Sequence, residues 1–164
     1  MSDKAELTCE RVKALLQYDP GTGVITWTRS RGKVKAGDTT GTPDKDGYLL
    51  VTVDGKKRKS HRLAWAIHYG VWPKGQIDHI NHIKTDNRIS NLRDASSAVN
   101  MQNVSRPNRR SKTQVLGVVH SGSKFKAVIT VSGKARHIGT FDTTDLAHAG
   151  YVEAKRRLHP GCTI

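Results

Sequence analysis

The chain has 164 residues and carries 28 Lys and Arg against 14 Asp and Glu, a formal net charge of +14. Apolar residues make up only 35% of it, and no apolar run is long enough to cross a membrane, so we expect no membrane partner. Cys9 and Cys162 lie at opposite ends, which excludes a disulfide framework and a cysteine-rich zinc site and suits a reducing cytoplasm. The positive charge favours a polyanionic partner, above all nucleic acid; the alternative is a generic basic surface.

The predicted elements of the first half alternate between short helices and strands. Asp54-Gly55 lies between two extended runs and is typical of a hairpin with a type I′ turn, which needs two positive φ angles. Pro73 and Gly75 are expected to end the helix that precedes them. In chain order, we predict a helix at residues 10–18, a strand at 24–28, hairpin strands at 47–53 and 56–60, and a helix at 61–69.

Residues 76–103 carry a concentration of polar side chains. Their pattern predicts a strand at 76–80, a polar loop at 81–88, a second strand at 91–95, and a helix from 97 to about 104. Ser96 is a good N-cap for this helix, because its hydroxyl can accept a bond from an unpaired backbone N–H. Strand, loop, strand and helix form a unit compact enough to hold one metal ion.

A basic, proline-containing segment follows and divides the chain. Residues 104–114 lack periodicity and have no acidic residue, which is typical of a linker. The segment's basic residues, which we expect to contact nucleic acid, are Arg106, Arg109, Arg110 and Lys112. We therefore predict a first domain at residues 1–103, a basic linker at 104–114 and a second domain at 115–164, with an α+β fold in both domains.

The second domain is predicted to contain three strands and one helix. The strands are expected at residues 115–120, 125–131 and 134–141, and the helix should begin after Asp142 as N-cap and reach Leu158. Basic residues alternate along the strands, and such a sheet fits the major groove of DNA. The residues expected to line its open face are Lys124, Lys126, Lys134 and Arg136.

The series Asp78-His79, Asn91 and Asn100 resembles the motif of the HNH nucleases. The segments His61-Arg62-Leu63-Ala64-Trp65 and Ile77-Asp78-His79-Ile80-Asn81 are similar to the phage and intron-homing branch, which often carries Asn at the third motif position. The resemblance covers about residues 45–104 and implies a ββα-metal fold. It also implies that Asn91 holds the loop and orients His79 through a hydrogen bond.

The same residues make chemical sense for phosphodiester hydrolysis. Asp78 and Asn100 offer two oxygen ligands, which favour one hard divalent ion, Mg²⁺ or Mn²⁺, over Zn²⁺. A histidine such as His79 is suited to act as general base near neutral pH. Phosphodiester hydrolysis needs both an activated water and stabilisation of the transition-state charge.

Each of these residues also has a simpler interpretation. An Asp-His pair at a strand end is common, and Asn favours turns and caps for its local hydrogen bonds. We interpret Asn87 as loop structure, expect His82 to be exposed and His68 to pack in the core, and leave His61 undecided between a phosphate contact and helix-start structure. The complete ordered pattern between basic segments nevertheless favours the nuclease.

The second domain resembles the Apetala-type (ethylene-response-factor) DNA-binding domain. The matching residues are Leu116-Gly117-Val118, Phe125-Lys126-Ala127-Val128-Ile129, Gly133-Lys134 and His137-Ile138-Gly139-Thr140-Phe141. In that family a three-stranded sheet lies in the major groove. The structural alternative is a small α+β packing module.

Together these observations predict a metal-dependent endonuclease of the HNH type that hydrolyses double-stranded DNA. By its resemblance it would be a phage or mobile-element homing enzyme. Two dissimilar DNA-contacting parts permit it to act as a monomer, and we expect no obligate protein partner. The main alternative is a non-catalytic, sequence-specific DNA-binding protein; an RNA-binding protein is the weaker one, because the sequence shows no usual aromatic stacking platform.

Overall fold

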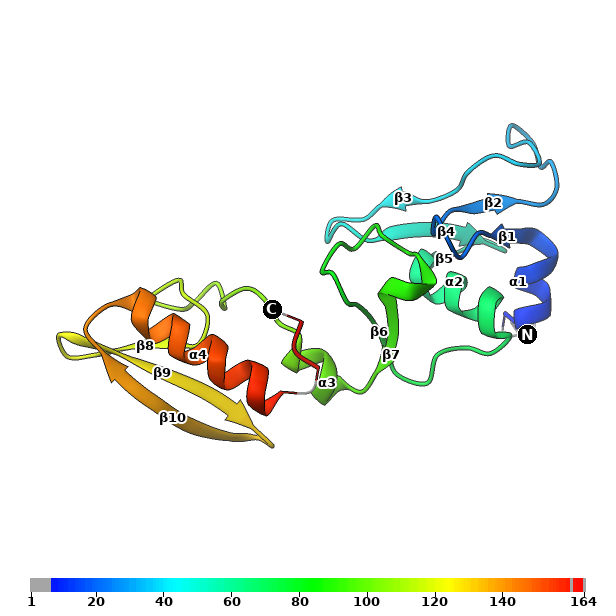
Figure 1. Ribbon diagram of the computed structural model, residues 1–164. Helices are drawn as coiled ribbons and strands as arrows, with labels where there is room; N and C mark the ends of the chain where they lie inside the picture. The colour runs from blue at the N-terminus through cyan, green and yellow to red at the C-terminus, as the bar shows by residue number, and fades with distance from the viewer. Residues whose placement is uncertain (1–6, 160, 164) are drawn as a thin grey trace, which may run out of the picture. The chain divides into compact units, whose positions relative to one another are not determined.

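The computed structural model describes residues 7–159 and 161–163, and it combines short helices with small antiparallel sheets (Figure 1). The chain divides into two compact units, Met1–Ala95 and Ser96–Ile164. The helix that the sequence assigns to the end of the first domain groups with the second unit.

The first unit consists of three small antiparallel sheets and two α-helices in its described part. The sheets are β1–β2, β3–β4–β5 and β6–β7. The elements are α1 (Cys9–Leu15), β1 (Leu16–Tyr18), β2 (Ile25–Trp27), β3 (Thr42–Pro43), β4 (Leu49–Val53), β5 (Lys56–Lys59), α2 (Ser60–Tyr69), β6 (Gln76–His79), the 3-10 helix η1 (Ile89–Asn91) and β7 (Leu92–Ala95). Their apolar side chains form one core, with Val12, Leu16, Val51, Leu63, Ile77 and Leu92 among its buried members.

The first helix is shorter than the sequence pattern predicts. It ends at Leu15, and the next three residues form β1, where Leu16 and Tyr18 are buried and Gln17 is exposed. Such alternation is typical of a strand, and β1 pairs with β2 over its whole length. The predicted helix to residue 18 is wrong because Leu16 satisfies both periodicities, and pairing with β2 decides between them.

Two turns in this unit depend on positive φ angles. Asp54 and Gly55 have φ of 47° and 76°, which confirms the predicted hairpin turn between β4 and β5. Helix α2 ends at Gly70, whose φ of 74° allows its N–H to bond to the Ala66 carbonyl. The prediction that Pro73 and Gly75 end this helix is wrong, because Gly70 ends it first.

In the second unit, one helix covers one face of a three-stranded antiparallel sheet (Figure 1). The elements are α3 (Ser97–Gln102), β8 (Val118–Ser121), β9 (Lys124–Val131), β10 (Lys134–Phe141) and α4 (Thr144–Leu158), with the strand order β10-β9-β8. Buried apolar residues of the sheet and α4 form the core: Val118, Ala127, Ile129, Ala147 and Tyr151.

Of the two N-caps predicted for the helices of this unit, one is confirmed and one is wrong. Ser96 caps α3 as expected, its side chain accepting a bond from the Val99 N–H. The N-cap of α4 is Thr143 and not Asp142, since the Thr143 hydroxyl accepts from the Leu146 N–H. Asp142 instead forms an exposed ion pair with Lys124, at 2.9 Å.

None of the helices in the described part of the chain has the length and apolarity needed to cross a bilayer.

Gly117 offers a direct test of the packing of α4 on the sheet. A Cβ at Gly117 would lie 2.0 Å from the Tyr151 ring, whereas one at Gly133 would meet nothing within 4 Å; both glycines have φ near 75°. We expect Gly117→Ala to lower the free energy of unfolding by about 2–3 kcal/mol more than Gly133→Ala, because only the first adds a steric clash to the same backbone strain. Urea denaturation of the two variants measures the difference, and equal losses would contradict the packing described.

Candidate active site and nucleic-acid interface

Asp78 and His79 are neighbours at the end of β6, both in buried positions. Asp78 lies directly opposite Arg93 of β7, and the two side chains form an ion pair. Asp78 is only 8% exposed. A buried carboxylate needs a compensating positive charge, which Arg93 supplies.

The His79 imidazole is held by a hydrogen bond and by two other rings. Its Nε2 lies 3.1 Å from Oδ1 of Asn87, and both residues are buried. The ring centroids of Tyr48 and His61 lie 5.9 Å and 5.1 Å from that of His79. Burial lowers the pKa of His79, and the bond that its ring donates to Asn87 opposes this effect. Burial thus disfavours the charged form of the ring, and the hydrogen bond to Asn87 fixes its orientation.

Tyr48, His61 and His79, which we call the ring cluster, join three elements of the first unit. Tyr48 precedes β4, His61 is in the first turn of α2, and His79 ends β6. Burial, together with the positive charge that a protonated His79 would carry beside it, lowers the pKa of His61 to about 3. His61, which the sequence left undecided, thus lies against His79 as a neutral ring.

Lysines of two further segments lie over the Tyr48 ring. The Nζ atoms of Lys59 and Lys84 are 4.1 Å and 4.7 Å from the centre of the Tyr48 ring. Asp44 forms an ion pair with Lys59, which lowers the pKa of Asp44 to about 2. The Lys84 ammonium also donates to the Asp46 carbonyl, at 2.6 Å.

Asn91 closes the loop between β6 and β7. Its Oδ1 accepts from the Asn81 N–H at 2.9 Å, and its Nδ2 donates to the Asp86 carbonyl at 2.8 Å. Asn91 therefore bonds to both ends of the loop. The amide that bonds to His79 Nε2 is that of Asn87, which the sequence pattern alone interprets as loop structure, so the orienting role that the resemblance implies for Asn91 is filled here by Asn87.

The N-terminal strands support this loop from outside. The Tyr18 hydroxyl donates to the Asn87 carbonyl at 2.7 Å, and the Ile89 N–H donates to the Pro20 carbonyl at 3.1 Å. A Cβ at Gly23 would lie 2.5 Å from the Arg88 nitrogen, so only glycine permits this approach. Residues 18–23 thereby fix the backbone that carries Asn87.

Asn100, the second predicted metal ligand, belongs to α3 and hence to the second unit. Its pairing with Asp78 stays a prediction. Among residues 7–159 and 161–163, no three His, Cys, Asp or Glu side chains converge on a point where they could hold a metal ion. A site here would depend on Asp78 together with amide or water oxygens.

Two further histidines are exposed. His82, in the loop, is exposed as predicted. His68 is exposed near the end of α2, so its predicted place in the core is wrong. The last turn of α2 presents it to solvent together with Tyr69, whose ring centroid lies 4.6 Å from that of His68.

The basic residues predicted to contact DNA are all exposed: Arg106, Arg109, Arg110, Lys112, Lys124, Lys126, Lys134 and Arg136. The strand register divides the last four between two faces. Lys124 and Lys126 alternate with the buried Ala127 and so share the face opposite α4, while Arg136 pairs with the buried Ile129 on the α4 side. The prediction that all four share one face is wrong, because β10 has a bulge between His137 and Gly139.

With this geometry established, comparison with known proteins gives one match. Residues 58–102 match the family model of the HNH endonucleases. The match begins in β5 and ends in α3, and it includes Asp78, His79, Asn87, Asn91 and Asn100. It indicates a nuclease that acts on DNA. No curated protein and no solved structure matches the chain.

Because of the Tyr18 hydroxyl, we expect the protein to lose stability at high pH. Burial raises the pKa of Tyr18 to about 12 from its ordinary 10.0. The native state holds this proton more tightly than the unfolded chain, so its stabilisation is complete below pH 10 and is lost between pH 10 and 12. In urea denaturation, we expect the wild type to lose about 1–2 kcal/mol more than Tyr18→Phe over this range. Equal losses would show that the hydroxyl is solvated.

Proposed function

We propose that this protein is a metal-dependent endonuclease that hydrolyses phosphodiester bonds in duplex DNA. The observation that carries the proposal is that the HNH match coincides with a buried, fixed histidine next to a buried carboxylate. A phage or mobile-element homing role is part of the proposal and rests on the resemblance of the sequence alone.

His79 is the proposed general base. With Nε2–H donating to Asn87, the neutral imidazole has its lone pair on Nδ1, the atom that would take a proton from the attacking water. Asn87 and the ring cluster keep the imidazole in one orientation, and Asn91 keeps the loop around it closed. Arg93, beside Asp78, would bind a non-bridging oxygen of the phosphate.

Asp78 and Asn100 are the proposed ligands of one Mg²⁺ or Mn²⁺. Carboxylate and amide oxygens are hard donors that suit these ions, so the residues present fit the group. When bound, the ion would stabilise negative charge on the phosphate and on the departing oxygen. In the structure Asp78 forms an ion pair with Arg93, so a bound ion would share this carboxylate with Arg93 or replace it there. Asp78, His79, Asn91 and Asn100 would then form the ββα-metal arrangement.

The second unit is proposed to bind the DNA target. Its three-stranded sheet with one helix supports the resemblance to the Apetala-type domain. Lys126 on β9 lies between Val119 and Thr140 on the face that α4 leaves open. The exposed arginines of residues 104–114 would add contacts to the phosphate backbone.

Substitution of His79 tests the proposed reaction. We expect His79→Ala to slow nicking of a supercoiled plasmid with Mg²⁺ about 10³-fold, because no group remains to take the proton. Asn87→Ala should cost about 10- to 100-fold, since it frees the ring to rotate. The matched control is His82→Asn, an exposed loop histidine, which should nick at the wild-type rate. If the wild type and His79→Ala behave alike, the protein is a DNA-binding protein without this chemistry.

Lys126→Ala tests the DNA-binding face. Loss of one phosphate contact should weaken duplex binding several-fold and reduce the slope of log K against log[salt] by about one. Arg157→Ala removes the same charge from α4 and should change both quantities less. Anisotropy titrations at several salt concentrations measure both, and identical effects of the two variants would rule out a specific role of the sheet.

A further inference from the structure

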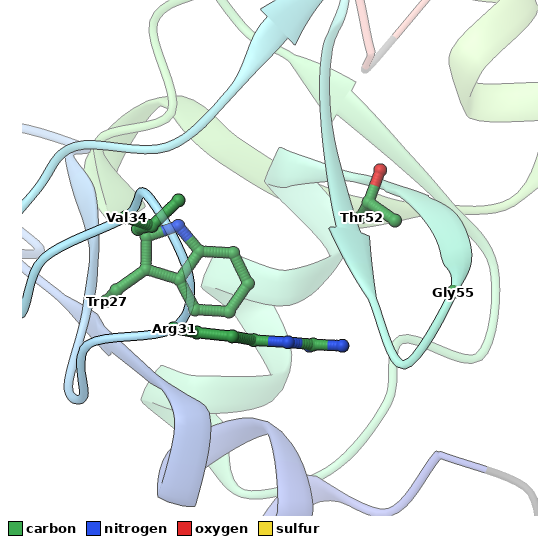
Figure 2. Close-up of a pocket in the computed structure, with 5 residues that line it drawn as sticks. All are labelled: Trp27, Arg31, Val34, Thr52 and Gly55. Carbon is green, nitrogen blue, oxygen red and sulfur yellow. The ribbon is translucent and has the colours of Figure 1, made fainter.

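A pocket in the first unit lies between the end of β2 and the β4–β5 hairpin. It has a volume of about 270 Å³ and is lined by Trp27, Arg31, Val34, Thr52 and Gly55. Figure 2 shows the Trp27 indole with Arg31 and Val34 beside it and, across the pocket, Thr52 and Gly55. Pockets for drug-sized ligands usually measure about 300–1,000 Å³, so this one suits a single flat ring system.

Hydrogen bonds fix the backbone at Trp27, whose indole forms one wall of the pocket. Trp27 pairs with Leu16 of β1, its N–H donates to the Asp38 carbonyl at 3.0 Å, and its carbonyl accepts from the Gly37 N–H at 2.8 Å. The loop that these bonds close is itself ordered by paired bonds between the backbones of Arg31 and Val34. The backbone that carries this aromatic side chain is therefore ordered before a ligand binds, which reduces the ordering cost of binding.

The charge around the pocket is positive. The loop at residues 28–38 carries Arg29, Arg31, Lys33 and Lys35, and the hairpin carries Lys56 and Lys57. Each segment has one acidic residue, and each is already bonded. Asp38 accepts the Lys35 N–H at 2.7 Å, and Asp54 accepts two bonds from Arg11, both at 3.0 Å. The pocket thus joins an aromatic face to cations, as a nucleotide requires.

We infer that this pocket binds one unpaired nucleobase of DNA, stacked on Trp27, with the adjacent phosphate on Arg31. Within a duplex both faces of a base are covered by its neighbours, so only an unpaired or extruded base can stack on an indole. Gly55 leaves the hairpin side of the pocket open, because a Cβ there would meet nothing within 4 Å. The inference rests on the proposed binding of DNA but not on cleavage.

The test uses the full chain with two probes of the same sequence, a single-stranded oligonucleotide and its duplex, in EDTA. We expect Trp27→Leu to weaken single-strand binding about tenfold, Trp27→Phe to keep it within about threefold, and duplex binding to change little. Arg31→Ala should weaken single-strand binding more than Lys33→Ala, which removes an equal charge from the same loop outside the pocket lining. Thermal unfolding identifies any variant that fails to fold, and the pair Arg31→Ala and Lys33→Ala leaves the Trp27 side chain intact.

The outcomes separate this inference from the proposed function. If the wild type binds DNA but Trp27→Leu binds the single strand equally well, or Arg31→Ala and Lys33→Ala lose affinity equally, the base pocket is refuted and the nuclease proposal stands. If Trp27→Leu weakens both probes alike, the pocket contacts paired DNA instead. If the wild type binds neither probe, both proposals fail.

Discussion

The hydrogen bonds of the Asn91 side chain hold the candidate active site together. One amide group reaches the Asn81 N–H and the Asp86 carbonyl, so the loop between β6 and β7 closes around two buried polar residues. Without this closure, the Asn87 side chain would have no fixed position from which to bond to His79. Buried polar groups are costly unless each has a partner, and the loop satisfies this condition with bonds among its own residues.

The loop in turn depends on the N-terminal strands, which lie outside the matched segment. Tyr18 and Pro20 bond to its backbone, and Gly23 allows the close approach that both bonds need. Residues 7–57 are thus more than an appendage of the HNH segment. They fix the carbonyl of Asn87 from one side while His79 engages its side chain from the other, which limits how far the loop can shift.

The sequence predicts those features that neighbouring residues determine. The Asp54-Gly55 turn, the Ser96 cap and the strands around Asp78 follow from local rules, and the structure has them. The ring cluster could not be predicted, because Tyr48, His61 and His79 meet only through the packing of β4, α2 and β6. Asn87 was missed for a different reason: Asn is so frequent in turns that its residue type did not distinguish a loop residue from a partner of His79.

The positive charge beside the ring cluster belongs to neighbouring lysines rather than to the histidines of the cluster. A proton on His61 would have to be buried beside Lys59, Arg62 and His79, and this is why its pKa falls to about 3. Burial disfavours the charged form of both imidazoles, and the positive charge near them lies on Lys59 and Lys84, over the Tyr48 ring. Under the proposed function, attraction of a polyanion and acceptance of a proton would thus fall to different side chains. For His79, burial lowers the pKa while the hydrogen bond to Asn87 and the charges of Asp78 and Asp86 act in the opposite direction, so it is the desolvation of the buried ring that disfavours its charged form.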